Sequence, residues 1–231
     1  MLRYMSAIAF AAGALSIAGS AQAQCSACEL FPPINNTQTF THAVLTNAVN
    51  VKVDGVHGDL KVSGTAVANN LSIDAGEGTT GTINNNQSFA SYGTNISSTV
   101  NVGAKTAGLG DVGGALDVEN TVVANNASIK LGACCTTAPT VNNVQTVSYD
   151  PTAIANVNLN TVGGDVDVAN TAVANNLSIE GRVAQINNTQ TSSWAPVNAT
   201  ANVNLGYAGA NVNVSGSAIG NNLSWKLTPG S

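Results

Sequence analysis

The sequence Ile34-Asn-Asn-Thr-Gln-Thr39 recurs three more times along the chain, with small changes. The later copies are residues 83–88, 141–146 and 186–191. A second motif, Ala66-Val-Ala-Asn-Asn-Leu-Ser-Ile73, follows each copy of the first; its later copies are residues 122–129, 172–179 and 218–225. Self-similarity of this kind is typical of stacked repeats rather than of a globule built around one pocket. The two motifs therefore define four units of about 50 residues each.

Apolar and polar residues alternate with a period of two through much of each unit. Asp165-Val-Asp-Val168 and Asn202-Val-Asn-Leu205 show the pattern, which is typical of short strands with one buried and one wet face. The phase of the alternation changes near Asn170-Thr171, and a slip of one residue moves every side chain to the other face of a strand. We therefore predict a turn or a bulge there and at the matching positions near Gly64-Thr65 and Asn120-Thr121.

Each unit is thus predicted to hold four short strands, arranged as two rungs. Eight rungs at the spacing of neighbouring strands would give a rod of roughly 40 Å. The sequence predicts an all-β fold, a β-solenoid of four units, and the runner-up is a Greek-key β-sandwich. The repeat domain is expected to span residues 34–225, with a C-terminal tail at 226–231.

The first residues have the features of a bacterial secretory signal. Arg3 gives a positive start, residues 7–19 are largely apolar, and Ala21-Gln22-Ala23 supplies a cleavage site. The apolar run is shorter than the roughly 20 residues that a membrane-spanning helix needs. We predict a signal peptide at residues 1–23, a Cys- and Pro-containing segment at 24–33, Sec-type export, and a location outside the cell or at its surface.

Composition limits the partners of the chain. Only 8% of the residues are charged, and the formal net charge is −5. This charge disfavours binding to nucleic acid or to an anionic lipid surface. Since 44% of the residues are hydrophobic, the chain is not of the highly charged, weakly apolar type that stays disordered. We expect an ordered protein with no nucleic-acid partner and no membrane span.

Asparagine and glutamine recur at matching positions of the four units. In Ile186-Asn-Asn-Thr-Gln190, an inward Ile186 takes Asn188 and Gln190 inward too, because strand side chains alternate. A buried amide is costly unless it is hydrogen-bonded, and stacking identical amides on neighbouring strands supplies the bonds. The preferred interpretation places one Asn of each Asn-Asn pair in a left-handed corner and stacks the Gln side chains inward, and a sugar-binding amide face is a further interpretation. Structural amide ladders are predicted at Asn36, Asn85, Asn143, Asn188, Gln38, Gln87, Gln145, Gln190, Asn70, Asn126, Asn176 and Asn222.

Four cysteines in an exported chain suggest disulfides. Cys28 and Cys135 each lie six residues before a first motif, so the two cysteine sites are expected at one corner of the repeat, two units apart. Four rungs correspond to about 19 Å, more than the roughly 7 Å that a disulfide allows between Cα atoms. We predict a local Cys25–Cys28 bond, whereas Cys134 and Cys135 either form a vicinal bond or pair with another molecule.

The sequence contains no recognisable catalytic constellation. His42 and His57 are the two histidines, and both lie in the first unit, where surface positions explain them better than an active site. Gly163-Gly-Asp-Val-Asp167 does not match the nine-residue motif of calcium-binding β-rolls, and Cys25-Ser-Ala-Cys28 has no matching second pair to complete a zinc site. We predict no enzyme activity, no cofactor and no metal site.

Two repeats carry a resemblance to a known family. Thr65-Ala-Val-Ala-Asn-Asn-Leu-Ser72 and Ser217-Ala-Ile-Gly-Asn-Asn-Leu-Ser224 resemble the secreted repeat proteins that anchor the adhesive holdfast of stalked alphaproteobacteria. The resemblance covers most of residues 34–225. It implies an envelope-attached, curli-like protein that tethers adhesive polysaccharide to the cell. The chain also resembles curli-type functional amyloid subunits, although the regular Gln-x-Gly-x-x-Asn spacing of that family is missing.

These features favour an extracellular structural protein in surface adhesion or biofilm formation. It would act either as a fibre subunit that self-associates end to end or as an envelope anchor with outer-membrane partner proteins. Open solenoid ends expose strand edges that template further strands unless they are capped. Lys226 and Pro229 at one end, and Pro32-Pro33 at the other, are candidate caps. A carbohydrate-binding module and a chaperone–usher pilin are the alternatives.

Overall fold

A computed structural model describes residues 33–75, 81–90, 94–106, 110–132, 138–194 and 196–226. In these ranges the chain forms strands and turns, and no helix there is long and apolar enough to cross a membrane. The predicted signal peptide, the segment 24–32 and the predicted tail beyond Lys226 lie outside the described residues.

The strands belong to three sheets, and each unit contributes one main strand to each sheet. Sheet A contains β1 (Ile34–Phe40), β4 (Thr82–Phe89), β8 (Thr140–Val147) and β11 (Gln185–Ser192). Sheet B contains β2 (Val44–Val53), β5 (Asn95–Ala104), β9 (Pro151–Val162) and β12 (Asn198–Ala208), with the short β6 (Asp111–Val112) beside β9. Sheet C contains β3 (Leu60–Asp74), β7 (Leu116–Lys130), β10 (Val166–Glu180) and β13 (Val212–Lys226). The chain is therefore a β-solenoid of four coils, which confirms the predicted fold class.

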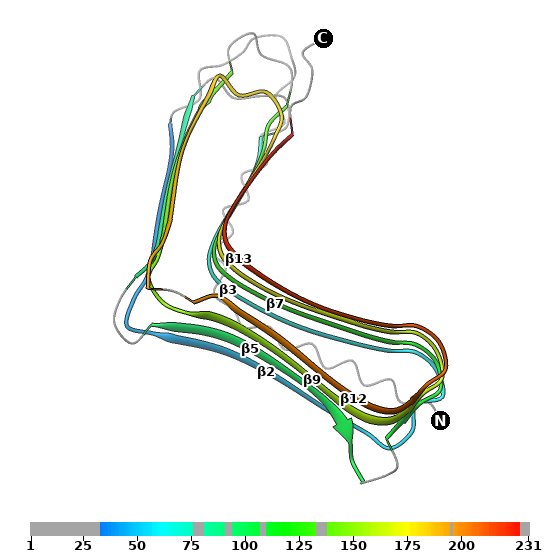
Figure 1. The fold of residues 1–231 in the computed structure, drawn as a ribbon. Coiled ribbons are helices and arrows are strands. Elements are labelled where there is room, and N and C mark those ends of the chain that lie inside the picture. The colour runs from blue at the N-terminus through cyan, green and yellow to red at the C-terminus, as the bar shows by residue number, and fades with distance from the viewer. Residues whose placement is uncertain are drawn as a thin grey trace.

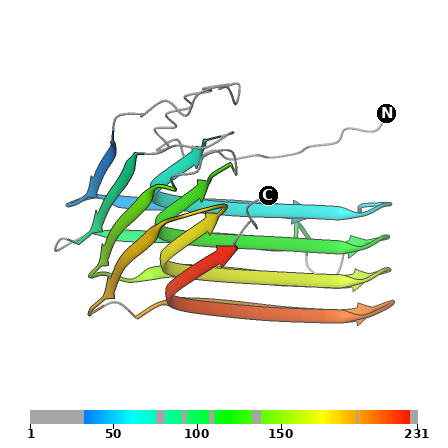
Figure 2. The same cartoon turned by 90° about the horizontal axis from the view of Figure 1, so that it is seen from above.

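Each strand pairs in parallel with the matching residues of the next coil. Ile34 lies opposite Ile83 and Gln38 opposite Gln87, so motif stacks on motif. Figure 2 shows the four coils lying side by side along the axis. Inward positions carry mainly Val, Ile, Leu and Ala, and β-branched side chains pack well on the pleated surface of a strand. The sequence repeat thus becomes a set of matching side chains stacked along one axis.

Sheet C bends in its middle, so that each coil has the outline of an L (Figure 1). The first half of a sheet C strand faces sheet B, and Val100 and Val118 belong to the core between these two sheets. The second half faces sheet A, and Ile83 and Leu177 belong to the core between those sheets. One 15-residue strand therefore serves both arms of the L.

Small residues line the inside of the bend. Ala172 and Ala174 of β10 are buried in a cluster with Phe89, whose ring stacks on that of Phe40 with centroids 5.5 Å apart. Ala174 and Asn175 are adjacent and both buried, so the inward face changes phase between them. The same arrangement recurs in coils 1 and 2, at Ala68–Asn69 and Ala124–Asn125. The bend thus lies within a continuous strand, at an alanine.

The predicted division of each unit into four strands and two rungs is wrong. The phase changes at Ala174–Asn175, within one continuous strand and a few residues beyond the turn or bulge predicted near Asn170-Thr171. Val173 is apolar and two positions before Asn175, but it lies between the inward Ala172 and Ala174 and so belongs to the first half of the strand. Each unit makes one coil of three strands, and four coils span about 19 Å at strand spacing rather than roughly 40 Å.

The Greek-key sandwich and the pilin alternative are also wrong. The strand pairs of the described residues are parallel throughout. Sandwiches of those classes are built from antiparallel strands joined by Greek-key connections. A solenoid differs because each connection returns the chain to the same sheet one coil later.

Stacked glycines form the corner between sheets B and C. The Gly164 amide donates to the Gly114 carbonyl at 2.9 Å, and the Gly114 amide donates to the Gly58 carbonyl at 3.0 Å. A Cβ added to Gly164 would lie 2.9 Å from the carbonyl carbon of Gly114, closer than a side chain tolerates. Glycine at this corner therefore allows adjacent coils to approach to hydrogen-bonding distance.

Candidate functional site: amide rows and the exposed last coil

A row of asparagine amides runs along the inside of sheet A. Asn36 Nδ2 donates to Asn85 Oδ1 at 2.6 Å, and Asn85 Nδ2 donates to Asn143 Oδ1 at 2.6 Å. Asn143 Nδ2 donates to Asn188 Oδ1 at 2.7 Å. Asn85 and Asn143 are buried, so these bonds offset the cost of removing the amides from water. The row links all four coils.

A glutamine row lies beside it and also ties sheet A to sheet C. Gln145 Nε2 donates to Gln87 Oε1 at 2.8 Å and to the backbone carbonyl of Asn176 at 2.9 Å. Gln145 Oε1 accepts from Gln190 Nε2 at 2.8 Å. Both amide donors and the acceptor of this buried side chain are therefore satisfied. Gln87 repeats the arrangement one coil earlier, with Gln38 and the Asn126 carbonyl as partners.

A row of sheet C asparagines also bonds to the backbone of sheet A. Asn125 Nδ2 donates to Asn175 Oδ1 at 2.9 Å and to the Thr146 carbonyl at 2.9 Å. Asn69 and Asn221 extend this row to the first and last coils. The row uses the first Asn of each Asn-Asn pair, which the sequence argument did not select. The signal for it was the buried phase of Leu71, because Asn69 and Leu71 share a face.

The second Asn of each pair forms a half-buried row on the other face of sheet C. Asn126 donates to Asn70 at 2.6 Å, Asn176 to Asn126 at 2.7 Å and Asn222 to Asn176 at 2.6 Å. The preferred interpretation, that one Asn of each Asn-Asn pair lies in a left-handed corner, is wrong. Among the described residues other than glycine, positive φ occurs at His42 (52°) and Trp194 (55°), both between sheets A and B.

A fourth inward amide links sheets C and B. Asn170 Nδ2 donates to the carbonyls of Ala153 and Thr200, each at 2.7 Å. Asn120 Nδ2 donates to Asn170 Oδ1 at 2.9 Å, whereas Asn120 Oδ1 is buried and has no hydrogen-bond partner among the described residues. Gly64 occupies the preceding position in coil 1 and offers no side-chain donor. This row therefore stops short of the first coil, unlike the rows at sheet A.

Each continuous row has one direction. In the Asn36 and Asn69 rows the N–H groups point from coil 1 toward coil 4, whereas in the Gln38 and Asn70 rows they point from coil 4 toward coil 1. One end of each row therefore carries a hydrogen-bond acceptor and the other end carries a donor. The Asn36 row starts at an acceptor, Oδ1 of Asn36, and finishes at a donor, Nδ2 of Asn188.

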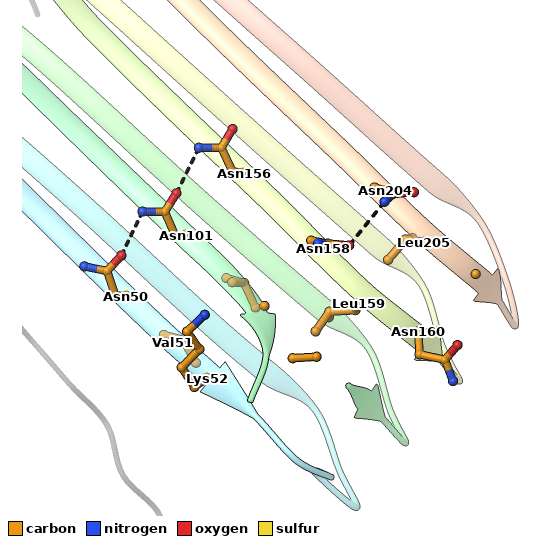
Figure 3. A pocket seen from close by; sticks show the side chains of 14 residues that line it. Asn50, Val51, Lys52, Asn101, Asn156, Asn158, Leu159, Asn160, Asn204 and Leu205 are labelled. Atoms are coloured by element: carbon orange, nitrogen blue, oxygen red, sulfur yellow. Dashed lines mark hydrogen bonds between the residues drawn. The ribbon is translucent and has the colours of Figure 1, made fainter. Parts of the chain in front are cut away.

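The outer face of sheet B carries a further amide row and a hollow (Figure 3). Asn101 donates to Asn50 at 2.8 Å and Asn156 to Asn101 at 2.9 Å. Beside this row lies a hollow of about 690 Å³, with Lys52, Gly103 and the asparagines in its lining. Gly103 is followed by the end of β5 at Ala104, and β6 begins only at Asp111. The hollow lies where a strand leaves the sheet.

Ion pairs on the outer surface link coils as well. Lys61 Nζ lies 2.7 Å from Asp117 Oδ2, and this hydrogen bond, with the nearby carboxylates, raises the pKa of Lys61 above its ordinary value. Lys226 Nζ lies 2.7 Å from Glu180 Oε1. That hydrogen bond lowers the pKa of Glu180 and raises the pKa of Lys226. These pairs are exposed, so they direct contacts more than they stabilise the fold.

Of the histidines and cysteines considered above for catalysis or metal binding, only the two histidines lie among the described residues. His42 lies in the corner after β1 and His57 in the turn before β3. No group of three or more His, Cys, Asp or Glu residues suited to a metal ion occurs in the part of the chain that the structure describes. The disulfide candidates Cys25, Cys28, Cys134 and Cys135 lie outside the described residues. The predicted pairings of these cysteines stay predictions.

A comparison with protein-family models gives one match over nearly the whole chain. The model of holdfast attachment protein D matches residues 11–231. The chain belongs to the holdfast attachment protein D family. No curated protein and no solved structure matches the chain. The resemblance carried by the Asn-Asn-Leu-Ser repeats is thereby confirmed.

Membership in the holdfast attachment protein D family gives the protein its role. The role is holdfast anchoring in surface adhesion, and it is structural. It implies association with holdfast components and a location at the cell envelope or surface. The rows of hydrogen bonds and the exposed side chains of coil 4 are the features of the fold that such a role can use.

Proposed function

We propose that the protein is an exported subunit of the holdfast anchor that assembles end to end into a fibre. The carrying observation is that the amide rows reach both the first and the last coil in register. In the described residues, the strands of coil 1 and coil 4 are the outermost members of all three sheets, and the side chains of β13 in coil 4 are mostly exposed. A strand edge without a neighbour accepts further strands. Another copy offers the same motifs at the same spacing, and so supplies a matching edge.

The open end of coil 4 also presents apolar side chains. Val214 and Leu223 of β13 are substantially exposed, whereas their counterparts Val168 and Leu177 in coil 3 are buried. Covering such side chains with another coil removes apolar surface from water, which favours association. The end of the solenoid thus combines a hydrogen-bonding edge with an apolar core cross-section.

A fibre built in this way would have cross-β geometry. Strands would lie across the fibre axis with a repeat of about 4.8 Å, as in functional amyloids. The proposal includes the predicted signal peptide at residues 1–23, because a surface fibre has to be exported. It also includes contact with adhesive polysaccharide or envelope proteins at one end of the fibre or along its sides.

Assembly of the exported chain tests this function directly. Sedimentation velocity and negative-stain microscopy are expected to show concentration-dependent fibres, one solenoid wide. The variant Val214→Lys/Leu223→Lys places charge on the open end of coil 4 and is expected to abolish fibres. The matched variant Asn204→Lys places charge on the side of the same coil and should leave fibres intact. A wild-type chain that stays monomeric would overturn the fibre in favour of a single-copy envelope anchor.

The hollow on sheet B supports a second candidate function, a carbohydrate-binding module. Ligand sites are concave and combine a few fixed polar groups with apolar walls. Asn158 and Asn160 supply amides here, Leu159 supplies an apolar wall, and Gly103 leaves the space open. A Cβ added to Gly103 would lie 4.0 Å from Lys52 Nζ, so a valine at 103 would project into the hollow beside Lys52.

Binding of defined glycans tests this second candidate. Cellulose oligosaccharides and alginate, a neutral and an acidic chain, are suitable probes for calorimetry with wild type and Gly103→Val. The candidate predicts binding to at least one probe and loss of that binding in the variant. Ser97→Val, on the outer face of the same sheet but away from the hollow, is the control. Equal binding by all three proteins would exclude the hollow as the site.

A further inference from the structure

The outer face of sheet A carries no charge. Its four strands contain no acidic or basic residue, and no glycine or proline either. By contrast, sheet B carries Lys52 in β2 and Asp111 in β6, and each strand of sheet C carries at least one charged residue. Among the described strands, sheet A alone therefore offers a surface that a partner can cover without removing a charge from water.

Three rows of outward side chains cross this face along the solenoid axis. One is a row of asparagines, in which Asn142 donates to Asn84 at 2.8 Å and Asn187 donates to Asn142 at 2.7 Å. Asn84 donates in turn to Asn35 at 2.7 Å. The middle row consists of Thr37, Asn86, Val144 and Thr189. The third row carries hydroxyl groups and consists of Thr39, Ser88, Thr146 and Thr191.

The shape of sheet A suits it to packing against another flat sheet. In Figure 1, which looks roughly along the solenoid axis, its four strands follow nearly the same line. Untwisted sheets are unusual, and they are typically stabilised by stacking or by ladders of identical side chains. Uncharged segments of about six or seven residues without proline, stacked in register, form dry interfaces in which the rows of two sheets interdigitate. The sequence Ile34–Phe40 of β1 is a segment of this kind.

A second copy of the chain matches this face in charge and in spacing. A charged partner would find no counter-charge on sheet A, and electrostatic complementarity selects partners at interfaces. Sheet A of another copy is equally uncharged. Its rows also repeat at the same strand spacing of about 4.8 Å, so each row can keep contact along its whole length.

A two-fold axis parallel to the solenoid axis brings suitable rows together. The two middle rows then face each other, with Val144, which is 44% exposed, opposite Val144 of the other copy. The asparagine row faces the hydroxyl row, so that Asn142 lies opposite Thr146. Each asparagine Nδ2 carries two hydrogens and its own row uses one of them, which leaves one to donate to a hydroxyl oxygen. The contact is apolar at its centre and hydrogen-bonded on both sides.

The size of the face determines how strongly two copies can associate. Four strands of about seven residues cover about 19 Å by about 23 Å, so a pair of copies buries about 900 Å² in total. Specific, stable interfaces bury about 1,200–2,000 Å², so two single copies are expected to pair weakly. In a stack of copies the buried area grows with every copy added. Fibres of the proposed kind, one solenoid wide when they form, would then pair side by side as they lengthen.

We propose that the outer face of sheet A is a lateral interface, at which two copies pack sheet A against sheet A about a two-fold axis parallel to the solenoid axis. The partner is the same face of a second copy, and Val144 lies at the centre of the contact. The interface does not depend on end-to-end assembly at coil 4, because it uses the side of the solenoid.

Charges at the centre of the face test the interface by complementation. The variant Val214→Lys/Leu223→Lys, designed above to block fibres, serves as the background, and sedimentation equilibrium up to millimolar protein is expected to show a reversible dimer. Val144→Lys or Val144→Glu added to this background sets like charges against each other, and is expected to weaken dimerisation at least about tenfold. An equal mixture of the two variants is expected to recover dimerisation through heterodimers, because position 144 faces itself across the two-fold axis.

A matched control separates this face from the rest of the surface. Ile154→Lys changes an outward β-branched residue of the same coil on sheet B, and is expected to dimerise like the background protein. Circular dichroism checks that all variants are folded. A background protein that stays monomeric, or Val144 variants that dimerise as well as it does, would overturn the lateral interface.

Two further outcomes distinguish the parts of the proposal. A mixture that dimerises no better than its components would overturn the two-fold arrangement. Failure of the wild-type chain to form fibres would overturn the proposed fibre, whereas a dimer of the background protein would still establish the lateral interface. If both hold, negative-stain images should show paired fibres for wild type and single fibres for Val144→Lys after long incubation.

Discussion

Coil 3 and coil 4 contain nearly the same motif, yet their side chains have different surroundings. Leu177 in coil 3 has none of its surface exposed, whereas its counterpart Leu223 in coil 4 has 47% exposed. The difference comes from neighbours alone, because coil 3 is covered on both sides and coil 4 on one. Stability in this fold therefore belongs to the contacts between coils, as expected for a linear array of repeats.

The largest difference between coil 3 and coil 4 is expected when the equivalent leucine is replaced in each. Leu177→Ala is expected to lower the free energy of unfolding by about 2–5 kcal/mol, because a fully buried leucine leaves a cavity. Leu223→Ala, made at a half-exposed site, is expected to cost less than about 1 kcal/mol. Urea unfolding of dilute monomer measures both, and equal losses would contradict the dependence on neighbours.

The glutamine row offers the next test. Gln145→Met keeps the length of the side chain but leaves Gln87 Oε1 and the Asn176 carbonyl without their donor. An unsatisfied buried group costs about 1–3 kcal/mol, and the variant is expected to lose that much in urea unfolding. Gln190→Met, in the half-buried last coil, should lose clearly less. If Gln145→Met were as stable as wild type, the row would not hold the coils together.

Substitution of outward side chains should cost about the same unfolding free energy in a middle coil as in an end coil. Asn156 and Asn202 belong to the outer row of sheet B in coils 3 and 4. Both lie on the outer face of the sheet, where Asn156 is half-buried and Asn202 is exposed, so water can reach the groups that lose a partner. Alanine at either position is expected to change the free energy of unfolding by no more than about 0.5 kcal/mol, as measured by urea unfolding. A large loss at Asn156 only would show that burial is not what separates the coils.

The smallest effect is expected from pH, through the ion pair that joins coils 3 and 4. The pKa of Glu180 is lowered in the folded chain, first by its hydrogen bond to Lys226 and then by the charges of Lys226 and Lys130. The pair therefore stabilises the fold above the ordinary carboxyl pKa, and this contribution is lost as pH falls below about 4. The pKa of Lys226 is raised, so the contribution is also lost at strongly alkaline pH.

Thermal unfolding as a function of pH measures this contribution. Lys226→Met should remove the acid-side loss that belongs to Glu180 and leave stability between about pH 5 and 9 almost unchanged. Lys61→Met, which breaks a comparable exposed pair in coils 1 and 2, is the matched control. An unchanged acid profile in Lys226→Met would show that the pair does not contribute.

Much of the architecture follows from the sequence repeat. Alternating Asn and Val, and motifs that return at nearly equal spacing, predict parallel stacked strands without knowledge of the turns. The family resemblance rests on the same motifs. Asn36 and Gln38 were assigned inward because they share a face with Ile34, and the structure places all three on the inner side of sheet A.

The number of coils was harder to predict because a bent strand and a turn have the same effect on the sequence pattern. Both move the apolar phase by one residue. At Ala124–Asn125 two adjacent residues face inward, and alanine makes this possible because it occupies little space at the inner side of the elbow. The inner Asn69 row was missed for the same reason, since its phase depends on where the strand bends.

The hollow on sheet B was not readable from the motifs. It arises because coil 2 leaves the sheet after Ala104 and returns at Asp111, in a stretch that the repeat does not constrain. Gly103 and Asn158 become neighbours only through pairing of β5 with β9. Insertions of this kind appear in the sequence as differences in length between units. The sequence does not indicate which residues of the neighbouring coils lie next to them.

The L-shaped outline has a mechanical meaning for an adhesive anchor. A single flat stack of strands bends easily in the direction perpendicular to its plane. Two arms set at an angle resist bending in both directions, because each arm is stiff in the direction in which the other is flexible. The hydrogen bonds between coils point along the axis, so tension applied along it loads those of three sheets at the same time instead of opening them one after another. A cell pulled by flow would therefore strain many weak bonds together, and the elbow alanines of sheet C keep both arms in one continuous strand.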